Sequence, residues 1–309
     1  MIFFQNFIDF LFCIYYDVLI KRQQIRRCSI AVSARGGKEM SIRYDFHLHS
    51  DFSADSDVPA RQMVERAICL GLCGICFTEH HDPDFPSDTL SFTLDPDSYF
   101  PALSALRKEY EKKLWIGIGM EFGIQPHLAP VLLQLAKQYP FDFIIASRHL
   151  LYGQDPYNRL CFKEKREDDC YADFFREQYT ALKQLPPDSY DTLGHLDYVV
   201  RYGPNQNLFY SYEKFADVID PILHHLIDND KCLEVNTGGL KYGLGEPNPC
   251  IGILRRYRDL GGELITLGSD AHTPQHLCFD FAKVQDILTF LGFRHYTVFR
   301  QRRPEQILL

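Results

Sequence analysis

Residues 41–55 read SIRYDFHLHSDFSAD, a β-rich run that ends in the pair His47 and His49. Its composition predicts a short buried strand. Two residues apart on a strand, both imidazole rings point to the same side, so together they can bind one cation. Such a pair alone is weak evidence, because a single histidine near an apolar run is more often a hydrogen-bonded structural residue. The rest of the chain decides between the two interpretations.

The same kind of strand recurs along the chain. Short β-rich runs alternate with helical stretches, which is the pattern of a βα repeat around a parallel sheet. The sequence predicts seven strands, at residues 42–47, 74–78, 114–120, 141–146, 192–196, 232–235 and 264–268. It predicts helices at residues 59–70, 96–112, 126–138, 171–184, 212–228, 249–260 and 279–291. Because no Pro/Gly/Ser-rich linker interrupts this alternation, we expect a single α/β domain over residues 40–309.

Polar residues follow each predicted strand. The strand ends carry the segments HLHSDFSAD, TEHHD, GMEFG, SRHL, GHLD, EVNTGG and GSDAH. In a parallel barrel these ends share one face, where catalytic groups collect. Six of the twelve histidines and three carboxylates lie there: His47, His49, Asp55, His80, Glu121, His149, His195, Asp270 and His272. Neutral imidazoles with a few carboxylates suit Zn, Mn or Fe better than Ca.

From about Met40 the chain resembles the PHP (polymerase and histidinol phosphatase) superfamily, whose HxH, TEH, GxE, SxH, GHxD and SDAH segments it contains in order. The resemblance implies a distorted, TIM-like (β/α)7 barrel with a site for two to three divalent metal ions. It distributes the nine candidate ligands over three metals: the first on His47, His49, Glu121 and Asp270, the second on the bridging Glu121, His149 and His195, and the third on Asp55, His80 and His272. Many members have histidine where this chain has Asp55, so the third site departs from the family pattern in part.

Within the superfamily, the chain is most similar to the stand-alone histidinol-phosphate phosphatases. The grounds are its compact length, TEHHD at residues 78–82 and EVNTGGLKYG at residues 234–243. This resemblance implies a phosphomonoesterase that hydrolyses L-histidinol phosphate to L-histidinol and phosphate in histidine biosynthesis. The alternatives are a PHP-type phosphoesterase or nuclease with another substrate, or a catalytically silent PHP interaction module. The complete ligand set argues against the silent module.

Clustered divalent cations suit phosphoester hydrolysis independently of any family. Two metals about 4 Å apart can hold a bridging hydroxide nucleophile and neutralise phosphate oxygens. Because a metal lowers the pKa of bound water to about 7, hydroxide is available at neutral pH and no protein nucleophile is needed.

Two arginines lie near predicted metal ligands. Arg201, six residues after His195, and Arg148, beside His149, are candidates for stabilising the phosphoryl group in catalysis, and Arg201 also for binding substrate. The alternative for each is a surface or inter-helix ion pair.

Three further polar positions each have two interpretations. His81, or Asp82, could protonate the leaving alkoxide, or could orient His80 from behind. Asn236 could bind substrate, or cap the turn that its TGG neighbours make. The charged run at residues 163–169 is typical of a solvated rim or lid within a long loop.

Composition limits the partners. The chain has 309 residues and a formal net charge of −8, which argues against a broad surface for the nucleic-acid backbone. Ten dispersed cysteines favour a reducing compartment over a disulfide scaffold. We therefore expect a cytoplasmic protein with a small phosphomonoester substrate, without a nucleic-acid or membrane partner. The sequence does not indicate the oligomeric state.

Residues 1–39 differ from the rest. Their apolar part is interrupted by Asn6, Asp9 and Asp17, and basic residues follow it, so neither a membrane span nor a secretory signal fits. We expect the domain to begin near Met40, after an extension of doubtful nativeness that an upstream start would add. An amphipathic membrane-surface helix and a helix packed on the domain are the alternatives. The extension has six basic and three acidic residues, so residues 40–309 alone have a net charge of −11.

Overall fold

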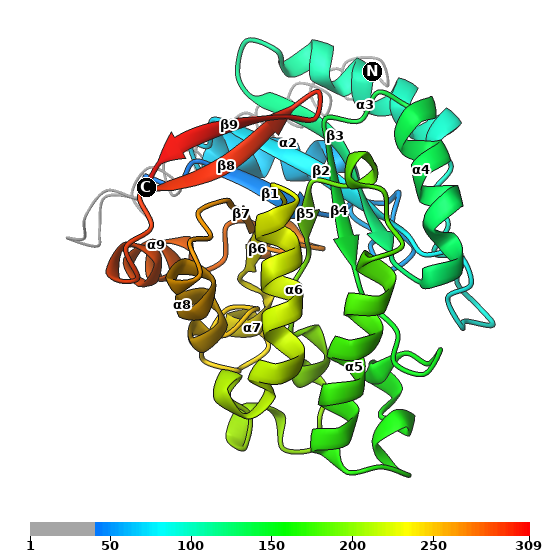
Figure 1. The fold of residues 1–309 in the computed structure, drawn as a ribbon. Coiled ribbons are helices and arrows are strands. Elements are labelled where there is room, and N and C mark those ends of the chain that lie inside the picture. The colour runs from blue at the N-terminus through cyan, green and yellow to red at the C-terminus, as the bar shows by residue number, and fades with distance from the viewer. Residues whose placement is uncertain (1–40) are drawn as a thin grey trace, which may run out of the picture.

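The computed structural model describes residues 41–309, so the expected extension over residues 1–39 lies outside the described residues. Seven parallel strands form one sheet in the order of the chain (Figure 1). They are β1 (Tyr44–Leu48), β2 (Gly74–His81), β3 (Trp115–Gly123), β4 (Phe143–Ser147), β5 (Thr192–Leu193), β6 (Cys232–Asn236) and β7 (Ile265–Gly268). All seven predicted strands are therefore present.

The first and last strands of the sheet come together. The Asp270 backbone N–H donates to the His47 carbonyl at 2.8 Å, and the His49 N–H donates to the Ala271 carbonyl at 2.9 Å. These bonds join the end of β1 to the residues that follow β7. The sheet is thus a nearly closed barrel, and the predicted distorted (β/α)7 fold is confirmed.

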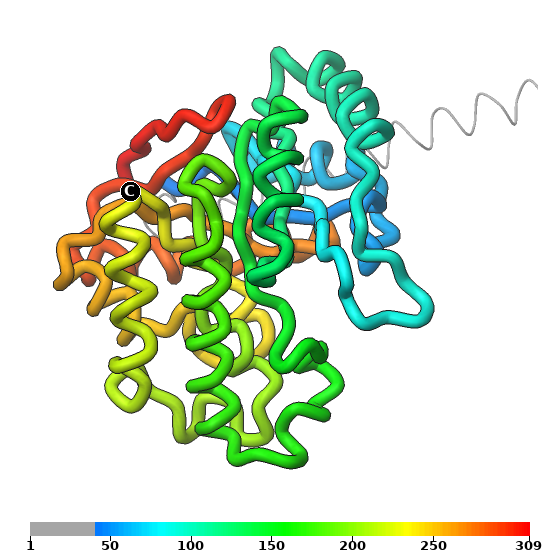
Figure 2. Tube along the Cα trace, turned by 45° about the vertical axis from the view of Figure 1, so that its right-hand side comes forward, coloured from blue at the N-terminus to red at the C-terminus, as the bar shows by residue number. Residues whose placement is uncertain are grey.

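Helices cover the outside of the barrel. They are α2 (Ala60–Cys69), α3 (Pro96–Tyr110), α4 (Ala129–Gln138), α5 (Glu167–Leu182), α6 (Ala216–Asp228), α8 (Ile251–Asp259) and α9 (Phe281–Phe290), with the short α7 (Gly238–Lys241) after β6. Helices α5 and α6 lie side by side (Figure 2). Strands buried on both faces need near-continuous apolar sequence, and β4 is buried at every position. No helix in the described part of the chain is long and apolar enough to cross a membrane.

An antiparallel hairpin, β8 (His295–Arg300) and β9 (Arg303–Leu308), ends the chain. It lies at the end of the barrel where the strands begin, as Figure 1 shows. The Phe299 ring packs on Phe143 with 5.1 Å between ring centroids, and the Gln301 N–H donates to the Asp142 carboxylate at 3.1 Å. The sequence analysis did not predict this hairpin, because it follows the last βα unit and adds nothing to the barrel repeat.

Several predicted boundaries were wrong. Strand β2 continues to His81, because it pairs with β3 as far as His81 and Phe122. Strand β5 pairs with its neighbours at only two residues and does not reach residue 196. Helix α5 begins at Glu167, so residues 167–169 are helical and not part of a loop. Its first turn has three acidic residues, which the positive end of the helix dipole favours.

Candidate metal centre

Glu121 is the centre of the candidate site. Its carboxylate is fully buried, and Glu121 lies near the end of β3, where it is paired with His80 on β2. Its Oε1 lies 2.9 Å from His195 Nε2 and 3.1 Å from His149 Nε2. Its Oε2 lies 3.2 Å from His47 Nε2 and 3.0 Å from His80 Nδ1. One carboxylate therefore faces two sets of imidazoles, which is the arrangement that a bridging ligand requires.

Closure of the barrel brings Asp270 to the HxH pair. Asp270 Oδ1 lies 3.6 Å from His49 Nε2 and 3.8 Å from His47 Nε2. The Asp270 backbone has a φ of 53°, in the left-handed region that Asp tolerates better than most residues. Such conformations cost about 1 kcal/mol or more and persist where the surrounding structure enforces them, often at functional sites.

A third group of donors lies at the outer side of the same cluster. Asp55 Oδ2 is 3.1 Å from His272 Nε2 and 3.5 Å from His80 Nε2. The His49 ring stacks on both His80 and His272, with 4.2 Å between ring centroids in each case. Asp55 is the most exposed of these donors, with 36% of its side chain accessible.

All nine predicted ligands thus meet in one place. Eight of them form groups of three whose donor atoms lie within 4.8 Å of one another, and Asp55 contacts two of the eight. Within residues 41–309, every such group of potential metal ligands belongs to this cluster. The grouping differs in detail from the three sets that the resemblance implies, because His80 faces Glu121 as well as Asp55.

The cluster contains polar atoms that the protein does not satisfy. His47 Nε2, His49 Nε2, His80 Nδ1 and Glu121 Oε2 are buried without a hydrogen-bond partner among the described residues. A buried donor or acceptor without a partner is costly and rare in native proteins. Four such atoms on imidazoles and a carboxylate are the ligand types that Zn, Mn and Fe prefer, so the residues present fit divalent cations.

The pKa shifts of the histidines indicate that the carboxylates of the cluster favour positive charge beside them. Burial lowers the pKa of His47, but the Glu121 and Glu234 carboxylates raise it well above the ordinary value. Burial also lowers the pKa of His149, while Asp82 and Glu121 raise it to about 10. By contrast, burial and the neighbouring His80 and His272 hold the pKa of His49 well below its usual range. Protons on some imidazoles thus balance the carboxylates, and bound cations would take their place.

A layer of carboxylates behind the ligands fixes the imidazole orientation. Glu234 Oε1 lies 2.5 Å from His47 Nδ1, and Asp82 Oδ1 lies 2.7 Å from His149 Nδ1. Ser53 Oγ is 3.1 Å from His49 Nδ1 and donates to the buried Glu79 at 2.6 Å. Carboxylates in this position set the tautomer of a metal-binding histidine and increase its basicity.

Glycine at position 268 makes room for this layer. A Cβ atom there would lie 2.3 Å from His47 Cβ and 2.6 Å from Glu234 Oε1. Both distances are far below van der Waals contact, so any larger residue would displace His47 or its partner. Gly268 is therefore required by the close approach of β1, β6 and β7.

The structure places Arg201 beside the candidate metal centre. It is 4% exposed, and its Nη1 donates to Asp270 Oδ2 at 3.1 Å. Its Nη2 donates to Asn236 Oδ1 at 3.0 Å and its Nε to Asn248 Oδ1 at 2.7 Å. Asn236 Oδ1 also accepts from the Gly238 N–H at 2.8 Å, so Asn236 caps the turn as one of its two interpretations expects.

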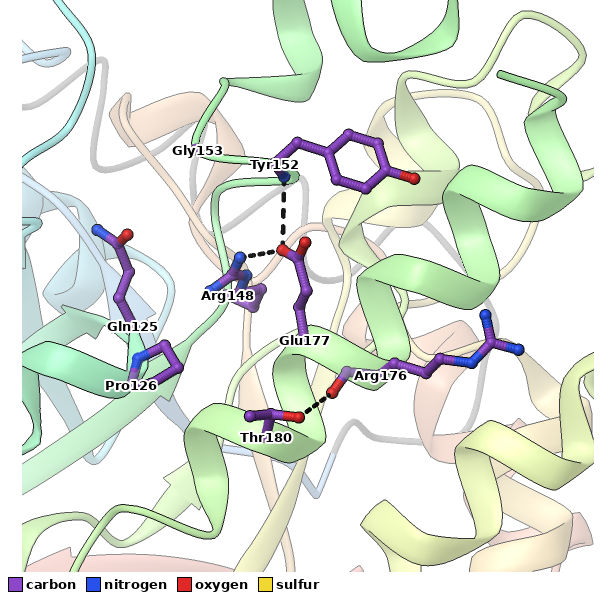
Figure 3. A pocket seen from close by; sticks show the side chains of 8 residues that line it. All are labelled: Gln125, Pro126, Arg148, Tyr152, Gly153, Arg176, Glu177 and Thr180. Atoms are coloured by element: carbon purple, nitrogen blue, oxygen red, sulfur yellow. Dashed lines mark hydrogen bonds and ion pairs between the residues drawn. The ribbon is translucent and has the colours of Figure 1, made fainter. Parts of the chain in front are cut away.

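Arg148 lies in a different environment (Figure 3). Its guanidinium pairs with Glu177 and donates to the carbonyls of Leu150 at 2.6 Å and Ile124 at 3.2 Å. With Tyr152 and other residues it lines a surface pocket of about 350 Å³. These contacts connect the segment after β4 to the Ile124 carbonyl and to the Glu177 side chain of α5, which favours the ion-pair alternative for Arg148 over a catalytic role.

His81 and Asp82, the two candidates for the leaving-group acid, lie in different environments. Because successive strand residues face opposite sides, His80 faces the cluster and His81 packs against Phe122 with 5.6 Å between ring centroids. Burial lowers the pKa of His81, which disfavours its acidic form. Asp82 contacts a candidate metal-ligand histidine, but this is His149 at 2.7 Å and not His80, whose Nδ1 is 3.6 Å away.

Comparison with known proteins agrees with this geometry. The PHP domain family matches residues 45–238. A histidinol-phosphatase of Lactococcus lactis subsp. lactis is 32% identical over 258 residues, covering 83% of this chain and 94% of the relative. A probable histidinol-phosphatase of Thermotoga maritima is 28% identical over 256 residues, covering 82% of this chain and 94% of the relative.

A solved structure is also similar. It is the crystal structure of histidinol phosphate phosphatase from Lactococcus lactis subsp. lactis Il1403 complexed with Zn, L-histidinol and phosphate. The two structures have a TM-score of 0.77 at 31% sequence identity, and the similarity covers 85% of this chain and 98% of the other. The likeness therefore extends over the barrel and its covering helices.

Proposed function

This chain belongs to the PHP domain family, and on that basis we propose that it is a metal-dependent phosphomonoesterase that hydrolyses L-histidinol phosphate to L-histidinol and phosphate. The observation that carries the proposal is the Glu121 carboxylate between two sets of imidazoles, with unsatisfied buried nitrogens around it. The relatives named histidinol-phosphatase support the substrate.

Two to three divalent cations would bind at this cluster. The fit rests on the donor set: His47, His49, Asp55, His80, Glu121, His149, His195, Asp270 and His272. Zinc is our first choice, because the similar Lactococcus structure contains Zn with L-histidinol and phosphate. Bound cations of this kind stabilise charge on phosphate oxygens and lower the pKa of a water nucleophile.

The chain's own residues would position the phosphate. Arg201 is buried beside Asp270 and uses one N–H of each nitrogen in contacts with the protein. The second N–H on each terminal nitrogen has no protein partner among the described residues. A guanidinium recognises phosphate oxygens through such pairs of N–H groups, so we assign Arg201 to the phosphoryl group of the substrate.

The proposal is tested by phosphate release. The full chain, loaded with Zn or Mn, is assayed with L-histidinol phosphate, para-nitrophenyl phosphate and single-stranded DNA. We expect turnover of L-histidinol phosphate with the highest kcat/KM, and loss of that activity in Asp270→Asn. The control is Asp217→Asn, which changes an exposed carboxylate on α6.

The assay also separates the alternatives. Cleavage of DNA without turnover of L-histidinol phosphate would make the protein a nuclease. Metal binding without activity on any of the three substrates would make it a silent PHP module. Either result contradicts the proposed function.

A further inference from the structure

Three buried side chains form a line that leads to the metal centre. Asp197, Asn248 and Arg201 are 1%, 0% and 4% exposed. Asn248 Nδ2 donates to Asp197 Oδ1 at 2.6 Å, and Arg201 Nε donates to Asn248 Oδ1 at 2.7 Å. We call these three side chains the Arg201 relay. The sequence analysis did not identify Asn248, and Asp197 appeared only within the GHLD segment.

The direction of each hydrogen bond in the relay is fixed by chemistry. A carboxylate only accepts and a guanidinium only donates, so the Asn248 amide between them can point in one way. Asp197 Oδ2 is held by the Cys250 N–H at 2.9 Å and the Tyr210 hydroxyl at 3.3 Å. Both oxygens of Asp197 therefore accept hydrogen bonds.

The Asn248 side chain is not needed to hold its own backbone. The Asn236 N–H donates to the Asn248 carbonyl and the Asn248 N–H donates to the Asn236 carbonyl, both at 2.8 Å. These two bonds attach the segment to the end of β6. Removal of the side chain would leave them intact, so its buried amide has a different task.

That task is to limit Arg201 to one oxygen of the Asp270 carboxylate. A free guanidinium pairs with a carboxylate through two parallel N–H groups. Here Nε donates to Asn248 and one N–H of Nη2 donates to Asn236, and of the three nitrogens only Nη1 donates to Asp270, at Oδ2. Asp270 Oδ1 is left facing His47 and His49.

We propose that Asp197 and Asn248 are positioning residues that keep Arg201 from a two-bond pair with Asp270 and so present its free N–H groups to the phosphate of a phosphomonoester. The proposal rests on the proposed function, since that assigns Arg201 to the phosphoryl group. It adds two residues and a reason for their burial. It predicts that their effect passes through Arg201 and is absent without it.

The test measures the affinity of the zinc-loaded full chain for inorganic phosphate at pH 8 by calorimetry, with zinc content and kcat and KM for a phosphomonoester alongside. In Asp197→Asn, an amide N–H would face the side-chain N–H of Asn248 or the backbone N–H of Cys250, and the negative charge would be lost, so we expect the phosphate Kd and KM to rise about tenfold, the scale of a lost charged hydrogen bond. The double variant Asp197→Asn with Asn248→Asp restores a donor and an acceptor at each contact. We expect it to bind phosphate within about threefold of the wild type, since no charged hydrogen bond is then lost.

A second pair of variants separates positioning from structure. Asn248→Leu removes the amide at similar volume and should weaken phosphate binding in the wild type but not further in Arg201→Ala. Asn207→Ala is the matched control, because Asn207 donates to the Leu244 carbonyl nearby without touching Arg201. Thermal melting checks that each variant is folded.

Three results would overturn the inference. These are wild-type phosphate affinity in folded Asp197→Asn, no recovery in the double variant, or an equal loss from Asn248→Leu with and without Arg201. If the wild type does not hydrolyse L-histidinol phosphate, the proposed function fails, while the phosphate affinities still test the relay.

Discussion

The two ends of the barrel both bury charged side chains, but the partners of these side chains differ between the ends. At the end where the strands begin, Asp142 accepts from the N–H groups of Ile118 at 3.0 Å and Gln301 at 3.1 Å, and pairs with Arg107. Asp191 accepts from the Ile144 N–H at 2.8 Å, and its Oδ2 lies 2.5 Å from Arg302 Nε. Here carboxylates connect the strands to the C-terminal hairpin, which lies at this end of the barrel (Figure 1).

At the opposite end, several buried polar atoms of one cluster make no hydrogen bond within the described residues. Glu121 faces four imidazoles, and although buried nitrogens of His47, His49 and His80 lie near its carboxylate, they make no hydrogen bond within the described part of the chain. A buried polar group without a partner lowers stability. The comparison therefore separates carboxylates that hold the fold together from a cluster that we expect a bound ligand to stabilise. Substitutions at matched residues of the two ends should show this difference.

The largest effect is expected at the centre of the cluster. We expect His47→Ala to reduce kcat for phosphomonoester hydrolysis about a thousandfold or more, the scale of loss when a principal stabiliser of the transition state is removed. His47 is buried between Glu121 and Glu234, so nothing else can replace its Nε2. The measurement is steady-state phosphate release, with circular dichroism to check folding.

The hairpin end supplies the matched histidine. His295 begins β8 and is exposed, so His295→Ala should retain the wild-type kcat. Full activity in His47→Ala would show that the cluster is not the catalytic site, whatever metal it binds.

A smaller effect is expected from the layer behind the ligands. Glu234→Gln keeps the size of the side chain but places an amide where one carboxylate oxygen contacts His47 Nδ1 and the other accepts from the His195 N–H at 2.7 Å. Loss of such a partner weakens metal binding by about 10- to 100-fold. We expect the zinc Kd, measured by competition with a chromophoric chelator, to rise by that factor.

The control is again at the hairpin end. Glu305 pairs with Arg300 on the neighbouring strand and is half exposed, so Glu305→Gln should leave the zinc Kd unchanged. Equal zinc affinities in the two variants would mean that Glu234 does not act on the ligands.

The sequence was sufficient for the barrel and for the collection of donors, because both follow from local patterns. Each strand is an apolar run, and the candidate ligands lie at or shortly after the ends of such runs, so the shared face of the strand ends brings them together. The sequence could not show how the donors are held. Glu234 is 187 positions from His47, and only the closure of β1 against β7 makes them neighbours.

Side-chain direction was the second limit. His81 and His80 are adjacent in the same segment, and the side of β2 that faces the cluster is decided by its pairing with β3. The role of Arg148 depended likewise on Glu177, a residue of α5 that no motif connects with it. Arg201 has the same type of side chain, and its neighbours Asn236, Asn248 and Asp270 place it at the cluster.

The smallest effect on function, with a measurable effect on stability, is expected from Asp142→Asn at the hairpin end. Asp142 is buried and accepts bonds on both oxygens, so an amide N–H in place of one oxygen would face a donor. Leaving a buried donor unpaired costs about 1–3 kcal/mol, and we expect the free energy of unfolding in urea to fall by about 2 kcal/mol. The exposed Asp259→Asn on α8 should not change it.

The same Asp142→Asn protein should retain its zinc Kd and its kcat, because the carboxylate of Asp142 does not contact the candidate ligands: its partners are Arg107, Ile118 and Gln301. One end of the barrel would then affect stability and not activity. The other end would affect activity through a bound ligand. A fall in zinc affinity as large as that of Glu234→Gln would break the comparison, since the two ends would then be coupled through the strands that join them.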